Sequence, residues 1–303
     1  MSEIRFLSGP QIESLALTPE DCVSLIRRTL ELHDRGALEM PPKIGVHPPK
    51  GRHVHAMSAF IPDIQALGLK WIADFPNNRS LGLATLSAII VLNDPDSGAP
   101  LCIMDGARIT ATRTAAMTAV SLLACARQNV ETAVIIGTGV QAAAQSRTLP
   151  AVFPRLRRFF VVGSDLAKAI RFCHDTGSPK FVPAATRKEA VESADIVVTV
   201  TNAVRDPLLE ADWLMLQRGG EMANGCREIL LLIVGESEAV VQLRIVRVLF
   251  DPGREPLNHS SKISVLKKFS RLAQRLIEVR PRRRLAPECT RQQKKYQKNR
   301  GPL

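Results

Sequence analysis

Three small residues, Gly137, Gly139 and Ala142, follow the apolar stretch "TAVII" in a G-x-G-x-x-A pattern and precede a segment of helical character. In such a loop the first glycine permits a tight turn after a buried strand, and the second lets the backbone approach a pyrophosphate. A small third residue allows close packing of the helix, whose N-terminus attracts phosphates. The pattern predicts dinucleotide binding, with a glycine-rich turn that binds nothing as the alternative.

The next predicted strand ends in "VVGSD", which places Ser164 and Asp165 where an acid contacts the adenosine ribose in dinucleotide-binding domains. That acid is expected about 20 residues beyond the glycines, and Asp165 comes 23 residues after Ala142. We expect NAD as the cofactor because no arginine replaces the acid. NADP is the alternative, because Lys168 is close enough to compensate.

A second chemically informative residue, Arg113, stands between two threonines where a run of small residues begins. We expect a helix to start after Thr112, so that its free amides, Arg113 and the hydroxyls of Thr112 and Thr114 together bind a pyrophosphate or a carboxylate. A surface arginine is the alternative interpretation.

The elements that position these residues follow from apolar periodicity. Thr18 and Pro19 begin a predicted helix that Gly36 ends, and residues 40–104 consist of short β-like pieces with a hairpin turn at "NDPDSG". After residue 112, helices alternate with the apolar strands "TAVIIG", "FFVVG", "FVPA" and "DIVVTVT". Such alternation predicts a parallel sheet with right-handed crossovers, and "SEAVVQLRIVRVLFD" is expected to supply a last strand or two.

Composition excludes several classes of function. From Arg254 onward the chain has 15 Lys and Arg against 3 Asp and Glu, whereas residues 1–253 hold 26 of each, so the net charge of +12 belongs to the C-terminal end alone. Nucleic acid is therefore not the expected partner of the main body. No apolar run approaches the ~20 residues of a membrane span. Six scattered cysteines without a C-x-x-C pair suit a reducing compartment, and we expect a cytoplasmic protein without a membrane segment.

Four segments in order, "GLKWIADFPNN", "NDPDSGAPLCIMDGARITATRTAA", "IIGTGVQA" and "DIVVTVTNA", resemble the ornithine cyclodeaminase/mu-crystallin family from about residue 18 to about residue 225. The resemblance implies a Rossmann-type doubly wound parallel sheet with an N-terminal α+β substrate-binding and dimerisation domain. It also implies a homodimer and NAD(P)-dependent chemistry at carbon–nitrogen bonds: deaminating cyclisation, ketimine reduction or amino-acid dehydrogenation. We place the domains at residues 1–116, 117–253 (degenerate after about 225) and a basic, solvated tail at 254–303.

Matched position by position, the resemblance assigns a substrate-facing role to Lys70 and places Arg113 and Thr114 at the substrate or the cofactor phosphates. Lys43 of "MPPK" stands where many members have an arginine for the substrate carboxylate. The remaining cofactor contacts implied by the family are Thr85, Val140, Gln141, Thr201 and Asn202.

The chemistry of Lys70 supports its assignment, because a lysine in the otherwise apolar segment "GLKWIAD" would have a lowered pKa that suits proton transfer. A lysine that reaches solvent from a strand edge is the alternative for Lys70 and for Lys43. His53 and His55 would share one face of a strand, but without a third ligand we predict no metal site. Asp74 and Asp105 are as well suited to structural caps as to catalysis.

The family pattern is lost near residue 226. An acid/base aspartate is expected after the turn in "DWLMLQRGGEMANGCREI", and Glu228 is the nearest acid, so we assign it that role. Either the C-terminus is divergent or its sequence is frame-shifted or alternatively spliced. The predicted function is an NAD(P)-dependent enzyme acting on an amino acid or a cyclic imine. The alternative is a non-catalytic, mu-crystallin-like protein that binds a cofactor or a small ligand.

Overall fold

A computed structural model describes residues 3–15, 17–49, 51–126, 129–201, 209 and 213, and the backbone of two strands, 229–233 and 244–248. These residues belong to one compact unit that spans residues 1–267. The described part of the chain forms two sheets of six strands each.

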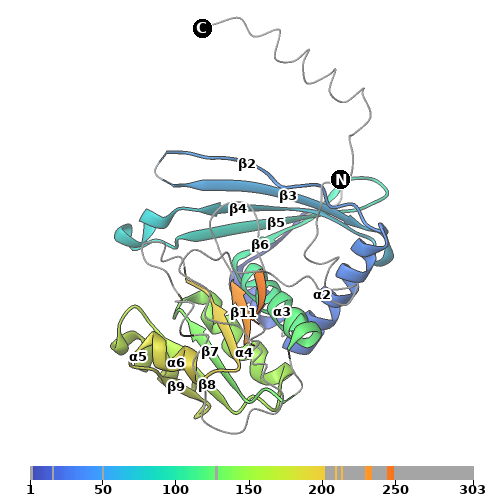
Figure 1. Cartoon of the computed structure of the whole chain (residues 1–303). Helices are drawn as coiled ribbons and strands as arrows, with labels where there is room; N and C mark the ends of the chain where they lie inside the picture. Colours follow the sequence, from blue (N-terminus) through green and yellow to red (C-terminus); the bar gives the residue numbers. More distant parts are fainter. Residues whose placement is uncertain are drawn as a thin grey trace, which may run out of the picture. The chain divides into compact units, whose positions relative to one another are not determined.

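The first sheet has the strand order β1-β6-β5-β4-β3-β2, and its pairs are antiparallel except for β1 with β6. Figure 1 shows β2 to β6 side by side. The strands are β1 (Arg5–Leu7), β2 (Ile44–Val46), β3 (His53–Ile61), β4 (Ala66–Asp74), β5 (Leu86–Asn93) and β6 (Pro100–Asp105).

The turns of this sheet follow from residue type. The predicted "NDPDSG" hairpin is confirmed: the Asp94 carboxylate accepts hydrogen bonds from the Ser97 amide (2.7 Å) and hydroxyl (2.7 Å), and Gly98 adopts a φ of 72°. A short 3-10 helix, η1 (Pro62–Ile64), joins β3 to β4, and another, η2 (Pro76–Leu81), lies between β4 and β5. The β3–β4 and β4–β5 connections therefore keep neighbouring strands antiparallel.

Two helices lie between β1 and β2 in the chain. Helix α1 spans Gly9–Ser14 and α2 spans Pro19–Asp34. As predicted, the Thr18 hydroxyl accepts a hydrogen bond from the Asp21 amide at the start of α2, and Gly36, with a φ of 67°, follows its end. The predicted boundaries of α2 are confirmed.

Helix α3 (Ala107–Cys125) begins earlier than predicted. The Asp105 carboxylate accepts a hydrogen bond from the Ala107 amide at 2.9 Å, which fixes the start of the helix there. Arg113 therefore lies in the second turn, and the expectation that it stands at the N-terminus beside free amides is wrong.

Helix α3 contacts β5, α2 and α4 (Figure 1) through a surface of small residues, with Ala115, Ala116 and Ala119 completely buried. The predicted domain boundary at residues 116/117 falls within α3 and remains a prediction.

The second sheet has the order β12-β11-β10-β7-β8-β9 and is parallel except for the pair of β11 with β12. Its strands are β7 (Thr132–Ile136), β8 (Arg158–Val162), β9 (Phe181–Pro183), β10 (Ile196–Thr199), β11 (Ile229–Ile233) and β12 (Arg244–Val248). Helices α4 (Val140–Val152), α5 (Leu166–Thr176) and α6 (Arg187–Glu192) connect β7 to β10. The strand order changes direction between β7 and β10, as in Rossmann-type sheets, so the predicted fold class is confirmed. The last strand predicted within "SEAVVQLRIVRVLFD" is β12.

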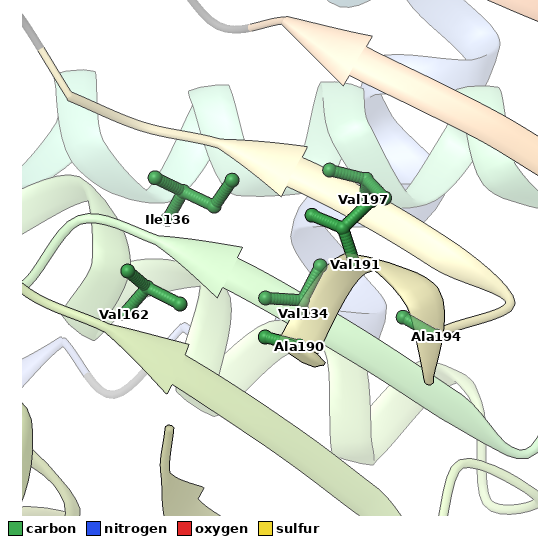
Figure 2. Packing of buried hydrophobic residues seen from close by; sticks show 7 residues of the cluster. All are labelled: Val134, Ile136, Val162, Ala190, Val191, Ala194 and Val197. Carbon is green, nitrogen blue, oxygen red and sulfur yellow. The ribbon is translucent and has the colours of Figure 1, made fainter. Parts of the chain in front are cut away.

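The core of the second sheet is aliphatic. Figure 2 shows side chains of β7, β8 and β10 packed against α6 and against Ala194, two residues beyond it: Val134, Ile136, Val162, Ala190, Val191, Ala194 and Val197. Continuous apolar strands are typical of a parallel sheet covered on both faces. The residues 254–303 of the predicted tail lie outside the described part of the chain.

We expect Ile135→Ala to lower the free energy of unfolding by about 2–5 kcal/mol, because Ile135 of β7 is 0% exposed and the lost methyl groups leave a cavity. Denaturant unfolding of the full chain measures this change. The control is Ile170→Ala on α5, whose side chain is 51% exposed and whose loss should cost little. Equal effects of the two substitutions would contradict the assigned core.

Candidate functional site

The loop between β7 and α4 has the backbone geometry that a dinucleotide requires. Gly137 has a φ of 129°, and a Cβ there would lie 2.7 Å from the Val200 carbonyl oxygen of the neighbouring strand end. Gly139 precedes α4, and a Cβ at Gly139 would meet nothing within 4 Å. The side chain of Ala142, the third small residue of the pattern, is completely buried. The loop thus leaves open space at the N-terminus of a 13-residue helix, where phosphate oxygens can accept backbone hydrogen bonds.

Three other predicted contact residues border this loop. Val140 is exposed at the first turn of α4, whereas Gln141 is buried and its Oε1 has no hydrogen-bond partner. Thr201 follows the β10 end that flanks Gly137. Asn202 and Glu228 lie outside the described residues, so their predicted roles remain predictions.

The end of β8 is organised by Asp165, which caps α5. Its carboxylate accepts a hydrogen bond from the Lys168 amide (2.9 Å) and forms an ion pair with the Lys168 ammonium (3.2 Å). The ammonium also donates to the Ser164 hydroxyl oxygen at 2.8 Å. Hydrogen bonds from Lys168 lower the pKa of Asp165, so the group is an exposed carboxylate. Ser164, Asp165 and Lys168 together form the polar group beside which a ribose would lie in a domain of this kind.

A cluster of cations lies between the first sheet and α3. Lys70 of β4 is largely buried, with Met57 and Ile90 as cross-strand neighbours, and it interacts electrostatically with Lys43 and with Arg113 of α3. Burial, then Arg113 and then Lys43, lower the pKa of Lys70 to about 7. Burial and Arg113 also lower the pKa of Lys43. The structure thus brings together the three residues predicted for substrate binding.

No carboxylate of the described residues forms a salt bridge with Lys43, Lys70 or Arg113. The Nε atom of Arg113 is buried without a hydrogen-bond partner, and burial lowers the pKa of its guanidinium. A buried polar group without a partner costs free energy, and so does mutual repulsion of cations. An anion of suitable size would relieve both, so the cluster is suited to an anionic ligand.

The two threonines predicted to contact the cofactor, Thr114 and Thr85, have different surroundings. The Thr114 hydroxyl is buried and donates to the Thr110 carbonyl at 2.7 Å, so its proton is already used within α3. Thr85 precedes β5, and its carbonyl accepts a hydrogen bond from the Phe75 amide at 2.7 Å. Their contacts with a cofactor remain predictions.

Sequence reasoning missed His47. Its ring centroid lies 5.3 Å from that of His53 and 5.7 Å from that of His55, and the rings of His53 and His55 are stacked at 6.0 Å. No pattern in the sequence reveals it, because the strand that precedes it, β2, has only three residues and is too short to show the alternation of a strand. Within the described ranges, no set of three His, Cys, Asp or Glu side chains has an arrangement suited to a metal ion.

Together, the glycine loop at a sheet switch point and the buried cation cluster define a dinucleotide-binding protein whose cations suit an anionic ligand. The chain matches the model of the ornithine cyclodeaminase/mu-crystallin family over residues 4–227 and belongs to that family. The resemblance stated from its motifs is thereby confirmed.

Individual relatives agree with this membership. The chain is 35% identical to the nodulation efficiency protein NfeD of Rhizobium meliloti over 220 residues, which cover 71% of this chain and 67% of that protein. It is similar to the structure of Thermococcus litoralis Delta(1)-pyrroline-2-carboxylate reductase in complex with NADH and L-proline, with a TM-score of 0.68, 27% identity, and coverage of 77% and 69% of the two chains. An archaeal alanine dehydrogenase dimer with bound NAD gives a TM-score of 0.64, 29% identity, and coverage of 70% and 64%. The matched region thus spans about two thirds of each relative.

No helix in the described part of the chain is long and apolar enough to cross a membrane.

We expect Gly139→Ala to weaken NADH and NADPH binding by at least about tenfold without changing stability, because its Cβ meets no protein atom but enters the space of the pyrophosphate. Gly137→Ala should weaken binding and also destabilise the fold, because of its positive φ and the 2.7 Å approach to Val200. Titration calorimetry and thermal unfolding separate the two effects. Unchanged dinucleotide affinity in Gly139→Ala would contradict the assigned loop.

Proposed function

We propose that the protein is an NAD(P)-dependent enzyme that acts on the carbon–nitrogen bond of an amino acid or of its imine. The observation that carries the proposal is the placement of Lys70, with a pKa of about 7, beside Arg113 and Lys43. The relatives described above, a pyrroline-2-carboxylate reductase and an alanine dehydrogenase, support this reaction class.

The residues fit a dinucleotide at the β7–α4 loop. Gly137 and Gly139 leave the backbone accessible, Val140 and Gln141 begin the helix, and Ser164 with Asp165 lies at the ribose end. When bound, a nicotinamide supplies hydride transfer. The described contacts do not favour NAD over NADP, because Asp165 suits a ribose hydroxyl whereas Lys168 suits a phosphate.

The substrate carboxylate would bind between Arg113 and Lys43. Lys43 keeps the positive charge of the arginine common in the family, but an ammonium cannot form the two parallel hydrogen bonds that a guanidinium makes with a carboxylate. Arg113 therefore supplies the directional hydrogen bonds. This arrangement presents the α-carbon and its nitrogen to Lys70. Carboxylate binding also favours the charged forms of the surrounding cations.

Lys70 is placed to move a proton to or from the substrate nitrogen. In the direction of imine reduction its ammonium donates the proton, and in the direction of amine oxidation its neutral amine accepts one. A pKa of about 7 lets both forms be populated near neutral pH. Glu228 stays the proposed second acid/base group.

We also propose that the protein is a homodimer in the cytoplasm. On the face of the first sheet opposite Lys70, Ile44, Ala56, Trp71 and Ile89 form an apolar row across four strands, and Asp105 of β6 follows Ile89 at its end. Trp71 is 44% exposed and Ile89 is 46% exposed. An exposed apolar sheet face of this kind is typical of an interface, and the alanine dehydrogenase relative is a dimer. The free thiols of Cys22, Cys102 and Cys173 agree with a reducing compartment.

The proposed reaction predicts that kcat/KM for imine reduction falls as pH rises through about 7, because Lys70 must then be protonated. For amine oxidation kcat/KM should rise over the same range. Lys70→Met should lower kcat at least about 100-fold and leave dinucleotide affinity unchanged.

Turnover of cyclic imines, ornithine and alanine with NADH, NADPH or the oxidised cofactors tests these expectations. The control is Lys188→Met on α6, an exposed lysine paired with Glu192, which should behave like the unmodified protein. Dinucleotide binding without turnover of any substrate would favour the mu-crystallin-like alternative. Failure to bind either dinucleotide would refute both.

For the dimer, Ile89→Lys should convert the protein to a monomer, because it places a charge beside Trp71 in the apolar row. Light scattering coupled to gel filtration measures the mass. Ile170→Lys on α5 is the matched control, since Ile170 is exposed away from this sheet. A monomeric unmodified protein, or a dimeric Ile89→Lys variant, would refute the interface.

A further inference from the structure

The residues that follow β8 form a polar loop at the ribose end of the dinucleotide site, and Gly163 is the first of them. Ligands of doubly wound sheets bind outside the carboxyl ends of the strands, so this position faces a bound ribose. A Cβ at Gly163 would lie 2.7 Å from the Asp165 carbonyl oxygen and 3.1 Å from the Ala169 amide nitrogen. Backbone atoms therefore fill the space of a side chain there, and the tip of the strand has a glycine instead of an acid.

Asp165 is the acid two residues further on, and both of its carboxylate oxygens already have partners. Oδ1 accepts a hydrogen bond from the Lys168 amide at 2.9 Å, which caps the 11-residue helix α5. Oδ2 accepts a hydrogen bond from the Ser164 hydroxyl at 3.2 Å and lies 3.2 Å from the Lys168 ammonium. An acid that selects NAD accepts a ribose hydroxyl and repels the 2′-phosphate of NADP. A carboxylate that caps a helix and is paired with an ammonium is poorly suited to repel a phosphate.

Lys168 brings a positive charge to the same loop. Its ammonium donates a hydrogen bond to the Ser164 hydroxyl oxygen at 2.8 Å, in addition to the ion pair with Asp165. The side chains of Lys168 and Asp165 are 60% and 51% exposed, so a ligand can reach both of them. An exposed ion pair contributes little free energy, whereas a phosphate dianion is a strong partner for an ammonium. Lys168 can therefore exchange Asp165 for a phosphate at little cost.

We propose that Lys168 makes this chain accept NADPH as well as NADH. With NADH bound, the ammonium stays paired with Asp165, and the ribose hydroxyls meet Ser164 and the neutralised carboxylate. With NADPH bound, the ammonium turns to the 2′-phosphate, and the Ser164 hydroxyl donates a second hydrogen bond to it. The inference rests on the proposed function only for the position of the dinucleotide, and it requires no turnover.

Calorimetry on the full-length protein tests this role of Lys168. The unmodified protein should bind NADH and NADPH with affinities within about tenfold of each other, and Lys168→Met should weaken NADPH binding by about tenfold, the value of one charge-assisted contact. Affinity for NADH should not change. The matched control is Lys180→Met, because Lys180 precedes β9 and so lies at the opposite end of the parallel strands. It should leave both affinities unchanged.

Asp165→Asn should shift the preference in the opposite direction. Asparagine accepts the same capping hydrogen bond from the Lys168 amide, so α5 keeps its cap, and thermal unfolding checks that stability is retained. Loss of the negative charge frees the Lys168 ammonium. NADPH should therefore bind more tightly and NADH no more tightly than in the unmodified protein.

Two adenosine fragments isolate the ribose end from the rest of the cofactor. Adenosine 2′,5′-bisphosphate differs from adenosine 5′-monophosphate only by the 2′-phosphate. The unmodified protein should bind the bisphosphate more tightly, and the difference should shrink as salt is added, because the charges involved are exposed. Lys168→Met should abolish the difference. This comparison needs neither a nicotinamide nor a substrate.

An unmodified protein that binds NADH more than about 100-fold more tightly than NADPH would overturn the inference. Unchanged NADPH affinity in Lys168→Met would overturn it as well. Binding of both dinucleotides without turnover would refute the proposed reaction and leave the role of Lys168 intact. Failure to bind either dinucleotide would refute both.

Discussion

The close approach of α3 to its neighbours is the constraint on which the site depends. Ala115, Ala116 and Ala119 are completely buried, and α3 packs against both α2 and α4. The Gln145 amide donates a hydrogen bond to the buried Thr118 hydroxyl at 2.9 Å, which ties α3 to α4. Larger side chains at these three positions would force the helices apart, since added volume in a dense core displaces the backbone. The helix that carries Arg113 is thereby held against the helix that begins at the glycine loop.

The cations that α3 helps to assemble are unfavourable for folding in isolation. Burial removes Lys70 and Arg113 from water, and their mutual repulsion adds to the cost. Groups arranged in this way are typical of functional sites, because the free energy that they cost in the empty protein is recovered when an anion binds. The lowered pKa of Lys70 and the proposed affinity for a carboxylate are two results of one arrangement.

Much of the fold could be predicted because helix starts, turns and buried strands are each marked by residues that lie within one short segment of the sequence. Thr18 and Pro19 marked the start of α2, Gly137 marked a turn with positive φ, and apolar runs marked the parallel strands. The start of α3 was misplaced because its cap is the Asp105 carboxylate, two residues before the first helical residue, whereas the run of small residues that indicated the helix begins only after Arg113.

The candidate site was predictable only in part. Lys70, Lys43 and Arg113 were identified by resemblance, but their mutual proximity depends on strand register and on the packing of α3, which no spacing in the sequence specifies. His47 was missed for the same reason: β2 has only three residues, too few to show alternation. Asn202 and Glu228 lie outside the described residues, and the sequence predictions for them stand alone.

Lys70 and Trp71 are adjacent in β4 but point to opposite faces of the first sheet. A deletion or insertion of one residue within β4 would exchange the two faces, turning the lysine away from Arg113 and the indole toward it. Length changes in the η1 or η2 connections do not exchange the faces, because they leave the alternation of side chains along β4 unchanged. Natural variation in chain length should therefore be tolerated at these turns and excluded from the strand between them.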